Sequence, residues 1–232
     1  MNLLAHLDAT FTLLDSLACG LVIAAWFGTG WLAENPPLWR PSVSRIMRDY
    51  RRRWMVEFLT REPRIFDVSL IDSLRQGAAF FASASMIAIG GGVAMIGNAS
   101  MLQGLAQDLT IGTEATQLRL KLILVVAFLA NALLKFVWSH RLFGYCAIMM
   151  AAVPNDHTDA RAAPKAAQAA EINITAAKSF DRGLSSIYFA LATLSWLIGP
   201  IVLLIVTAMT TAVLLRREFA SHSRAVMLQG QA

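Results

Sequence analysis

Three polar side chains lie inside apolar stretches of this sequence, where an ionisable group is costly and therefore often functional. Asn131 and Lys135 are four residues apart, so they share one face of a helix. Such a stripe is typical of a proton or ion path. Lys135 also lies one turn from the end of its stretch, where its stem can lie along lipid while its ammonium reaches headgroups, and we expect this second role. Asp15 lies near the start of another stretch, and we expect it to form an ion pair that orients helices. The candidate partners of Asp15 are Lys121, Arg119, Arg216 and Arg217.

The stretch from Arg51 to Arg75, RRRWMVEFLTREPRIFDVSLIDSLR, alternates arginines with carboxylates and aromatic residues directly before an apolar stretch. One interpretation is an internal network of ion pairs. The alternative is a docking surface for a lipid phosphate or a partner protein, because arginine binds phosphate through paired hydrogen bonds. The candidate contact residues are Arg51, Arg52, Arg53, Trp54, Arg61 and Arg64.

The other side chains that carry chemistry form no recognised motif. The four histidines (His6, His140, His157 and His222) include no H-E-x-x-H pattern and no pair at helical spacing. Cys19 and Cys146 form no C-x-x-C pair. We therefore expect no catalytic residue, no metal and no cofactor, and we expect that the chain is not an enzyme.

The composition indicates which elements must position these residues. Of the 232 residues, 56% are hydrophobic and only 15% are charged, whereas a soluble domain has about 25% charged residues. This excludes a disordered chain and a nucleic-acid-binding domain and predicts an all-α, polytopic membrane protein. Crossing about 30 Å of hydrocarbon takes roughly 20 apolar residues. Four segments satisfy this, and we expect a four-transmembrane-helix bundle that forms a single membrane domain over 1–232. The predicted spans are 11–33, 77–97, 120–138 and 184–215, the last of them tilted or bent at Pro200.

The lysines and arginines predict how the spans are oriented, because basic residues concentrate in cytoplasmic loops. The connection 34–76 holds nine of them and the stretch from Lys135 to Arg182 holds six, which makes fifteen on one side. The other side has Arg119, Lys121 and the three arginines after Leu215. We therefore predict that both termini are periplasmic and that the connections 34–76 and 139–183 are cytoplasmic. The basic tail is the one feature that disagrees.

The two cytoplasmic connections differ in pattern. From Ser42 to Glu62 a stripe of apolar residues recurs every four positions among arginines, which predicts a basic amphipathic helix in the membrane interface between the first two spans. The stripe consists of Ile46, Tyr50, Trp54 and Phe58. In the second connection, residues 155–168 are rich in Asp, Ala, Pro and Lys, which predicts a flexible loop.

An ordered series of segments resembles a known family. The segments RRRWM, REPRIFD, AFFASASMIAIGG, LKFVWSHRLFGY, YFALATLSW and RREFAS are similar to the pattern of the bacterial membrane proteins catalogued as domain of unknown function 599. The usual family stretch is Phe-Phe-Ala-Ser-Thr, and here Ala84 stands in place of the threonine. The resemblance implies a multi-pass protein of the bacterial inner membrane with no assigned activity, and it carries over no site residues.

Three classes of function remain. We expect a non-enzymatic scaffold or accessory component that contacts anionic headgroups at the cytoplasmic face, another membrane protein or a second copy of itself, and no nucleic acid. The alternative is an oligomeric transporter or channel subunit for a small solute or ion, lined by Asp15, Asn131, Lys135 and Trp138. An intramembrane enzyme comes third, because no acid, base and nucleophile can be assembled.

Overall fold

A computed structural model describes residues 12–37, 39–98 and 115–229. Within these ranges the chain forms helices and no strands, which confirms the all-α prediction. The helices are α2 (Leu13–Glu34), α3 (Val43–Glu57), α4 (Ile65–Gly97), α6 (Ala115–Ala151), α7 (Ala162–Leu194), the 3-10 turn η1 (Ser195–Leu197), α8 (Pro200–Phe219) and α9 (His222–Gln229).

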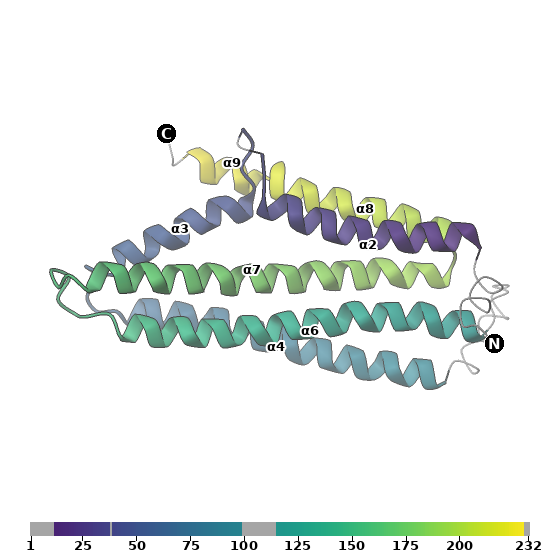
Figure 1. The fold of residues 1–232 in the computed structure, drawn as a ribbon, viewed down its shortest axis with the longest axis horizontal. Coiled ribbons are helices and arrows are strands. Elements are labelled where there is room, and N and C mark those ends of the chain that lie inside the picture. Colours follow the sequence, from purple (N-terminus) through teal and green to yellow (C-terminus); the bar gives the residue numbers. More distant parts are fainter. Residues whose placement is uncertain (1–11, 38, 99–114, 230–232) are drawn as a thin grey trace.

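The long helices lie side by side, with α7 in the middle (Figure 1). Helices α2 and α8 pack together on one side of α7, and α6 and α4 follow on the other side. Helix α3 lies across the end of α7. Four helical segments are long and apolar enough to cross a membrane: Leu13–Glu34, Ile65–Gly97, Thr116–Ala151 and Pro200–Gln229.

The predicted fourth span, 184–215, is wrong as a single helix. Helix α7 ends at Leu194, and after η1 the chain reverses so that α8 runs back along α2 (Figure 1). The break has a local cause. Pro200 has no N–H to donate and disfavours helical geometry in the residue before it, but it fits the first position of a new helix.

This reversal also places the two ends of the described chain at opposite ends of the bundle, whereas the sequence predicts both termini on the same side. Trp196, just before α8, donates to Asp15 near the start of α2, at 2.7 Å. At the other end of α8, Arg40 donates to the carbonyl of Phe219 and Arg224 donates to the carbonyl of Pro41. The described chain therefore starts at one end of the bundle and ends at the other. The three tail arginines join the other fifteen basic residues, which removes the disagreement in the charge count.

The predicted loop over 155–168 is also wrong in its second half. Helix α6 continues to Ala151, and α7 begins at Ala162. Alanine is the strongest helix former, and four alanines of this first part of α7 are buried in a core to which α3 and α6 contribute most of the other residues. They are Ala162, Ala166, Ala169 and Ala170, which share a core with Ile71, Cys146 and Met150.

The amphipathic segment after Ser42 does form a helix, α3, and Ser42 caps its first turn by accepting from the Arg45 N–H. Part of its apolar stripe is covered by protein rather than left free for lipid, whereas Val56 on the same helix is 64% exposed. Ile46 and Phe58 are each 2% exposed, and α3 packs against α7. Contacts with the rest of the protein therefore bury the two ends of the stripe, Ile46 and Phe58.

Helices α6 and α7 approach each other closely near the middle of their lengths. Phe136 of α6 is fully buried and packs between Phe81 and Phe180. Its ring lies directly on Gly183 of α7, where an added Cβ would be 2.7 Å from Phe136 Cε1. Only glycine fits here, and the next residue along α7 toward the amino terminus, Arg182, belongs to the site described below.

Candidate functional site: a charged cavity beside α7

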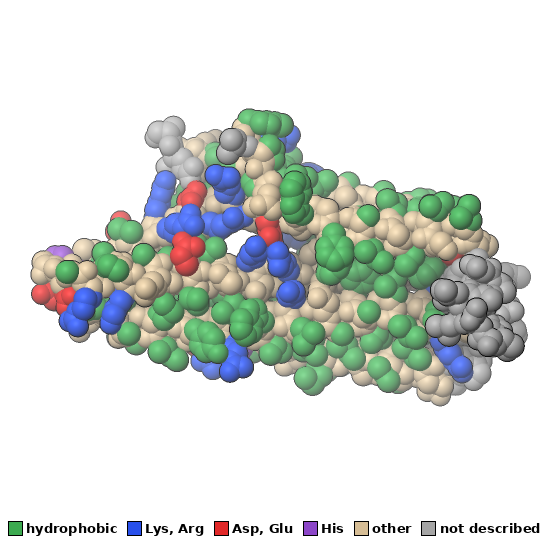
Figure 2. Space-filling view, viewed as in Figure 1, with side chains coloured by type: hydrophobic (Ala, Val, Ile, Leu, Met, Phe, Trp, Pro, Cys, Tyr) green, Lys and Arg blue, Asp and Glu red, His purple; other side chains and the backbone are tan. Residues whose placement is uncertain are grey.

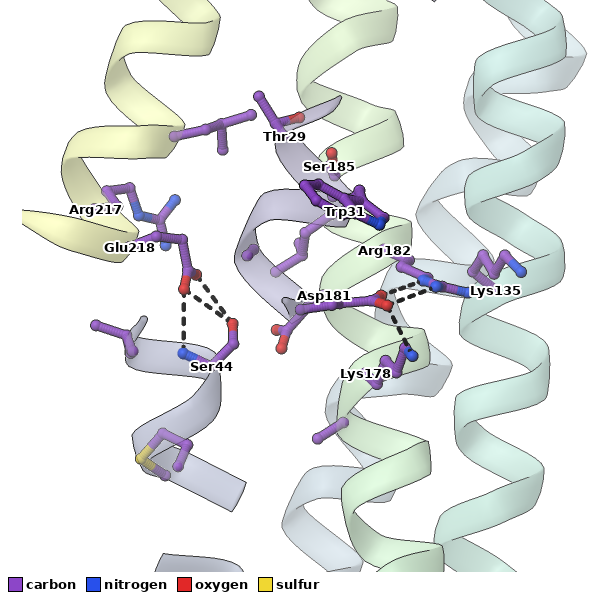
Figure 3. A pocket seen from close by; sticks show the side chains of 18 of the residues that line it. Thr29, Trp31, Ser44, Lys135, Lys178, Asp181, Arg182, Ser185, Arg217 and Glu218 are labelled. Atoms are coloured by element: carbon purple, nitrogen blue, oxygen red, sulfur yellow. Dashed lines mark hydrogen bonds and ion pairs between the residues drawn. The ribbon is translucent and has the colours of Figure 1, made fainter. Parts of the chain in front are cut away.

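A cavity of about 700 Å³ lies between α7 and the ends of α2, α3 and α8 (Figure 3). Asn131 and Lys135 of α6 form part of its wall. Figure 2 shows lysine, arginine and acidic side chains gathered around a hollow between α3 and α7. The cavity thus lies where the mainly apolar half of the bundle meets its charged half.

Charged side chains of both signs line the cavity, and cations outnumber carboxylates by six to three. The cations come from four helices and include four arginines and two lysines. They are Arg48, Arg51, Lys135, Lys178, Arg182 and Arg217; the carboxylates are Glu34, Asp181 and Glu218.

Glu34, the last residue of α2, holds two of these cations. Arg182 approaches its carboxylate with two nitrogens: Nε lies 2.5 Å from Oε1 and Nη2 lies 2.8 Å from Oε2. The Lys178 Nζ lies 2.7 Å from the same Oε2. One carboxylate therefore joins the end of α2 to two successive turns of α7.

The other polar groups bind neutral partners. Glu218 accepts from the backbone N–H and the hydroxyl of Ser44, at 3.0 to 3.1 Å, which joins α8 to the start of α3 (Figure 3). Arg48 donates to the main-chain carbonyl of Glu34 at 2.7 Å, and Arg217 donates to the Tyr188 hydroxyl at 2.8 Å. Arg51 donates to the Asn173 side chain.

Positive charge therefore remains uncompensated in the cavity. Among the described residues, Arg48, Arg51, Lys135 and Arg217 have no carboxylate within ion-pair distance. Asp181 is the third carboxylate of the lining, and burial and the neighbouring Glu218 raise its pKa to about 6. Its side chain lines the cavity and is exposed there. A site of this kind attracts anions.

The structure brings together two of the three polar residues singled out within the apolar stretches. Asn131 and Lys135 both line the cavity, and Asn131 donates to the Ser186 hydroxyl at 2.7 Å. Asp15 lies at the opposite end of α2, where it accepts from Thr12 and Trp196.

The predicted partners of Asp15 are divided between the two ends of the bundle, and of these Lys121 interacts electrostatically with Asp15. Lys121 lies over the Trp196 ring, 5.6 Å from its centroid, at the same level as Asp15. The predicted partners Arg216 and Arg217 lie at the other end of the bundle, because α8 runs in the same direction as α2 and both residues are at its end.

Most of the arginine-rich stretch contacts the protein itself. Arg52 pairs with Glu171 at 2.8 Å and Arg53 lies over the Tyr50 ring. Fully buried Asp67 accepts from Trp54 Nε1 at 2.6 Å and from Arg61. Arg64 donates to the carbonyls of Val153 and Pro154. Of the six predicted contact residues, Arg51 alone is in the cavity lining.

Sequence reasoning missed Glu34, Lys178, Asp181 and Arg182. The signal was present: Lys178, Asp181, Arg182 and Ser185 recur at intervals of three and four and therefore share a helix face. The composition of the segment predicts a connection, however, and a helix face is not expected there. In the described residues no group of three or more His, Cys, Asp or Glu side chains is placed to hold a metal ion, and His6 lies outside them.

Comparison with known proteins gives one match. A family model described as "Protein of unknown function, DUF599" matches residues 17–223. This confirms the resemblance seen in the sequence. No curated protein and no solved structure gives a significant match.

Proposed function

Since the chain belongs to the DUF599 family of proteins of unknown function, we propose its role from the cavity: it is a non-enzymatic inner-membrane protein that binds the anionic headgroup of an amphiphile. The observation that carries the proposal is the excess of cations in the cavity lining, four of which have no ion-pair partner among the described residues. A binding role is favoured over a catalytic one because the polar groups of the cavity are cations and their counter-ions.

The position of the cavity relative to the membrane supports this ligand. The half of the bundle that holds α8 and most of α2 shows mainly hydrophobic and uncharged surface, and charged side chains gather in the other half (Figure 2). With α8 folded back, eighteen of the twenty lysines and arginines belong to the cavity end. By the positive-inside rule this end is cytoplasmic. The cavity then lies at the level of the inner-leaflet headgroups, with the described C-terminal end cytoplasmic and the start of α2 periplasmic.

The cavity lining favours an amphiphile over a purely soluble anion. Phe27 and Trp31 of α2 line the cavity and are exposed, at 64% and 66%. Acyl chains can lie against these rings in the hydrocarbon while a phosphate reaches the arginines. Arginine is suited to this contact because its planar guanidinium forms paired hydrogen bonds with phosphate.

The test is competitive binding of short-chain phospholipids to the purified protein in a neutral detergent. We expect dihexanoyl phosphatidylglycerol to bind and dihexanoyl phosphatidylcholine to bind at least tenfold more weakly. The double variant Arg48→Gln/Lys135→Gln should lower the affinity for the anionic lipid by about tenfold or more, since it removes two charged contacts.

The matched control is Arg75→Gln/Arg141→Gln, which removes two exposed arginines that lie outside the cavity lining. It should leave the affinity unchanged within about twofold. Equal binding of both lipids to the wild-type protein, or an equal loss in both double variants, would contradict the proposal.

A second candidate, transport of a small ion or solute, is favoured by one observation: Asn131 and Lys135 lie on the cavity wall. Against it, the outer half of the bundle is filled by buried residues, among them Val22, Phe189 and Leu203. Transport predicts that Asn131→Leu and Lys135→Leu each abolish flux into proteoliposomes at unchanged protein levels. Retained flux, or none in the wild-type protein, would remove this candidate.

A further inference from the structure

Glu34 occupies the position in the cavity where an anionic ligand would bind best. The Glu34 side chain is 16% exposed. Its carboxylate is bound by Lys178 Nζ and by Nε and Nη2 of Arg182, at 2.5 to 2.8 Å. Paired hydrogen bonds from one guanidinium plus one ammonium are also the usual way in which proteins hold a phosphate. The carboxylate and a ligand phosphate therefore compete for the same two cations.

The location of Glu34 makes this contact weaker than its short distances indicate. Glu34 is the last residue of α2, and a negative charge at the C-terminus of a helix is disfavoured by the helix dipole. Its two partners are about half exposed, Lys178 at 45% and Arg182 at 47%, and exposed ion pairs contribute little to stability. A lipid phosphodiester carries one negative charge, as the carboxylate does, but it is not held at the end of a helix, so it can displace the carboxylate.

We infer that Glu34 is an internal competitor of the ligand: the phosphate of a bound amphiphile displaces the Glu34 carboxylate from Lys178 and Arg182. This inference rests on the proposed function and adds how access to the site is controlled. Displacement breaks the only ion pairs that join α2 to α7 among the described residues, so binding loosens the end of α2. Arg48, which donates to the main-chain carbonyl of Glu34, lies beside this junction.

The test compares Glu34→Gln with Glu218→Gln. Both variants remove one negative charge from the cavity lining, but Glu218 accepts from Ser44 and forms no ion pair with a cation among the described residues. We expect Glu34→Gln to raise the affinity for dihexanoyl phosphatidylglycerol by about tenfold, because two ion pairs no longer have to be broken. Glu218→Gln should raise it by no more than about threefold. Equal gains in both variants, or no gain in Glu34→Gln, would overturn the inference.

A measurement on the wild-type protein keeps the inference testable if Glu34→Gln fails to fold. Amide hydrogen exchange of residues 31–35 should become faster when dihexanoyl phosphatidylglycerol is added, and slower or unchanged exchange would contradict displacement. Glycerol 3-phosphate serves as the soluble probe: a similar gain of Glu34→Gln for this anion would identify a free phosphate ester rather than a lipid as the competing group. If the wild-type protein binds the anionic lipid and Glu34→Gln binds it equally, the proposed function stands and this inference fails. If neither protein prefers the anionic lipid, the proposed function fails as well.

Discussion

The contact between Gly183 and Phe136 offers a direct test of the packing that positions Arg182. A methyl group in Gly183→Ala would lie 2.7 to 3.0 Å from three atoms of the Phe136 ring, whereas carbon atoms pack at about 3.5–4.0 Å. The ring must therefore retreat by roughly 1 Å. It is fully buried and has Phe81 and Phe180 beside it, with ring centroids 5.3 and 5.4 Å away, so little space is available.

The expected magnitude combines two effects. Overpacking of a filled core costs about 1–3 kcal/mol, and replacing a helical glycine with alanine contributes roughly 1 kcal/mol in the opposite direction. Gly183→Ala should therefore lower the free energy of unfolding by about 0–2 kcal/mol. Gly144→Ala is the matched control, because it lies in the neighbouring helix α6 and a Cβ there meets no atom within 4 Å. It should raise the free energy of unfolding by up to about 1 kcal/mol.

The assay is unfolding in mixed micelles with increasing SDS, followed by circular dichroism. The free energy of unfolding of Gly183→Ala should be lower than that of Gly144→Ala by about 1–3 kcal/mol. The gain in helix propensity is the same in both variants and cancels in this difference. Because Arg182 is next to Gly183, the same variant should also weaken binding of the anionic lipid. If Gly183→Ala is as stable as Gly144→Ala, the close packing of α6 on α7 described here is wrong.

Three further predictions concern topology, pH and the buried carboxylate of α4. Fusion of green fluorescent protein after Gln229 should fluoresce and fusion of alkaline phosphatase there should be inactive, because α8 returns to the basic end; the opposite pair of results would restore the same-side arrangement of the termini. The pKa of Asp181 is raised to about 6, so affinity for the anionic lipid should rise as the pH falls from 7.5 to 5, and Asp181→Asn should abolish that dependence. Asp181 also makes the stability of the fold depend on pH. Its contribution to stability is largest below its unfolded pKa of about 3.8 and is lost as the pH rises through about 6. Asp67→Ala should destabilise the fold by about 3 kcal/mol, since it leaves the Trp54 N–H and Arg61 without their buried acceptor, whereas exposed Asp72→Ala should change stability by less than about 0.5 kcal/mol in thermal unfolding.

The sequence predicts the first three spans well because each is a long apolar run with few charges. Helix α7 was predicted only in part. The part from Ala162 to Arg182 is rich in alanine and carries Lys178, Asp181 and Arg182, so it has the composition of a connection. Its polar groups are accommodated because neighbouring helices surround it. The reversal at Pro200 was predicted as a bend, since a proline in an apolar run does not say whether the chain continues or returns.

The candidate site was harder to predict because its contacts are distant in the sequence. Glu34 and Arg182 are 148 residues apart, and no local spacing reveals such a pair. The positions of Asn131 and Lys135 on one helix face were predicted from their spacing, and both line the cavity. The arginine-rich stretch was correctly recognised as unusual, but periodicity does not distinguish an apolar stripe that faces lipid from one that is covered by α7.

The most direct test of the central claim locates the bound lipid. Short-chain phosphatidylglycerol with a diazirine beside its phosphate would be irradiated with the wild-type protein in detergent, and the adducts would be located by peptide mass spectrometry. We predict adducts in the segments that line the cavity, residues 26–34, 43–51 and 174–188, and fewer with excess unlabelled anionic lipid than with excess phosphatidylcholine. The contradicting result is adducts spread along the exposed face of α4, at residues such as Phe80 and Ile87, with none in the cavity segments. This result would show that the cavity does not bind the lipid headgroup.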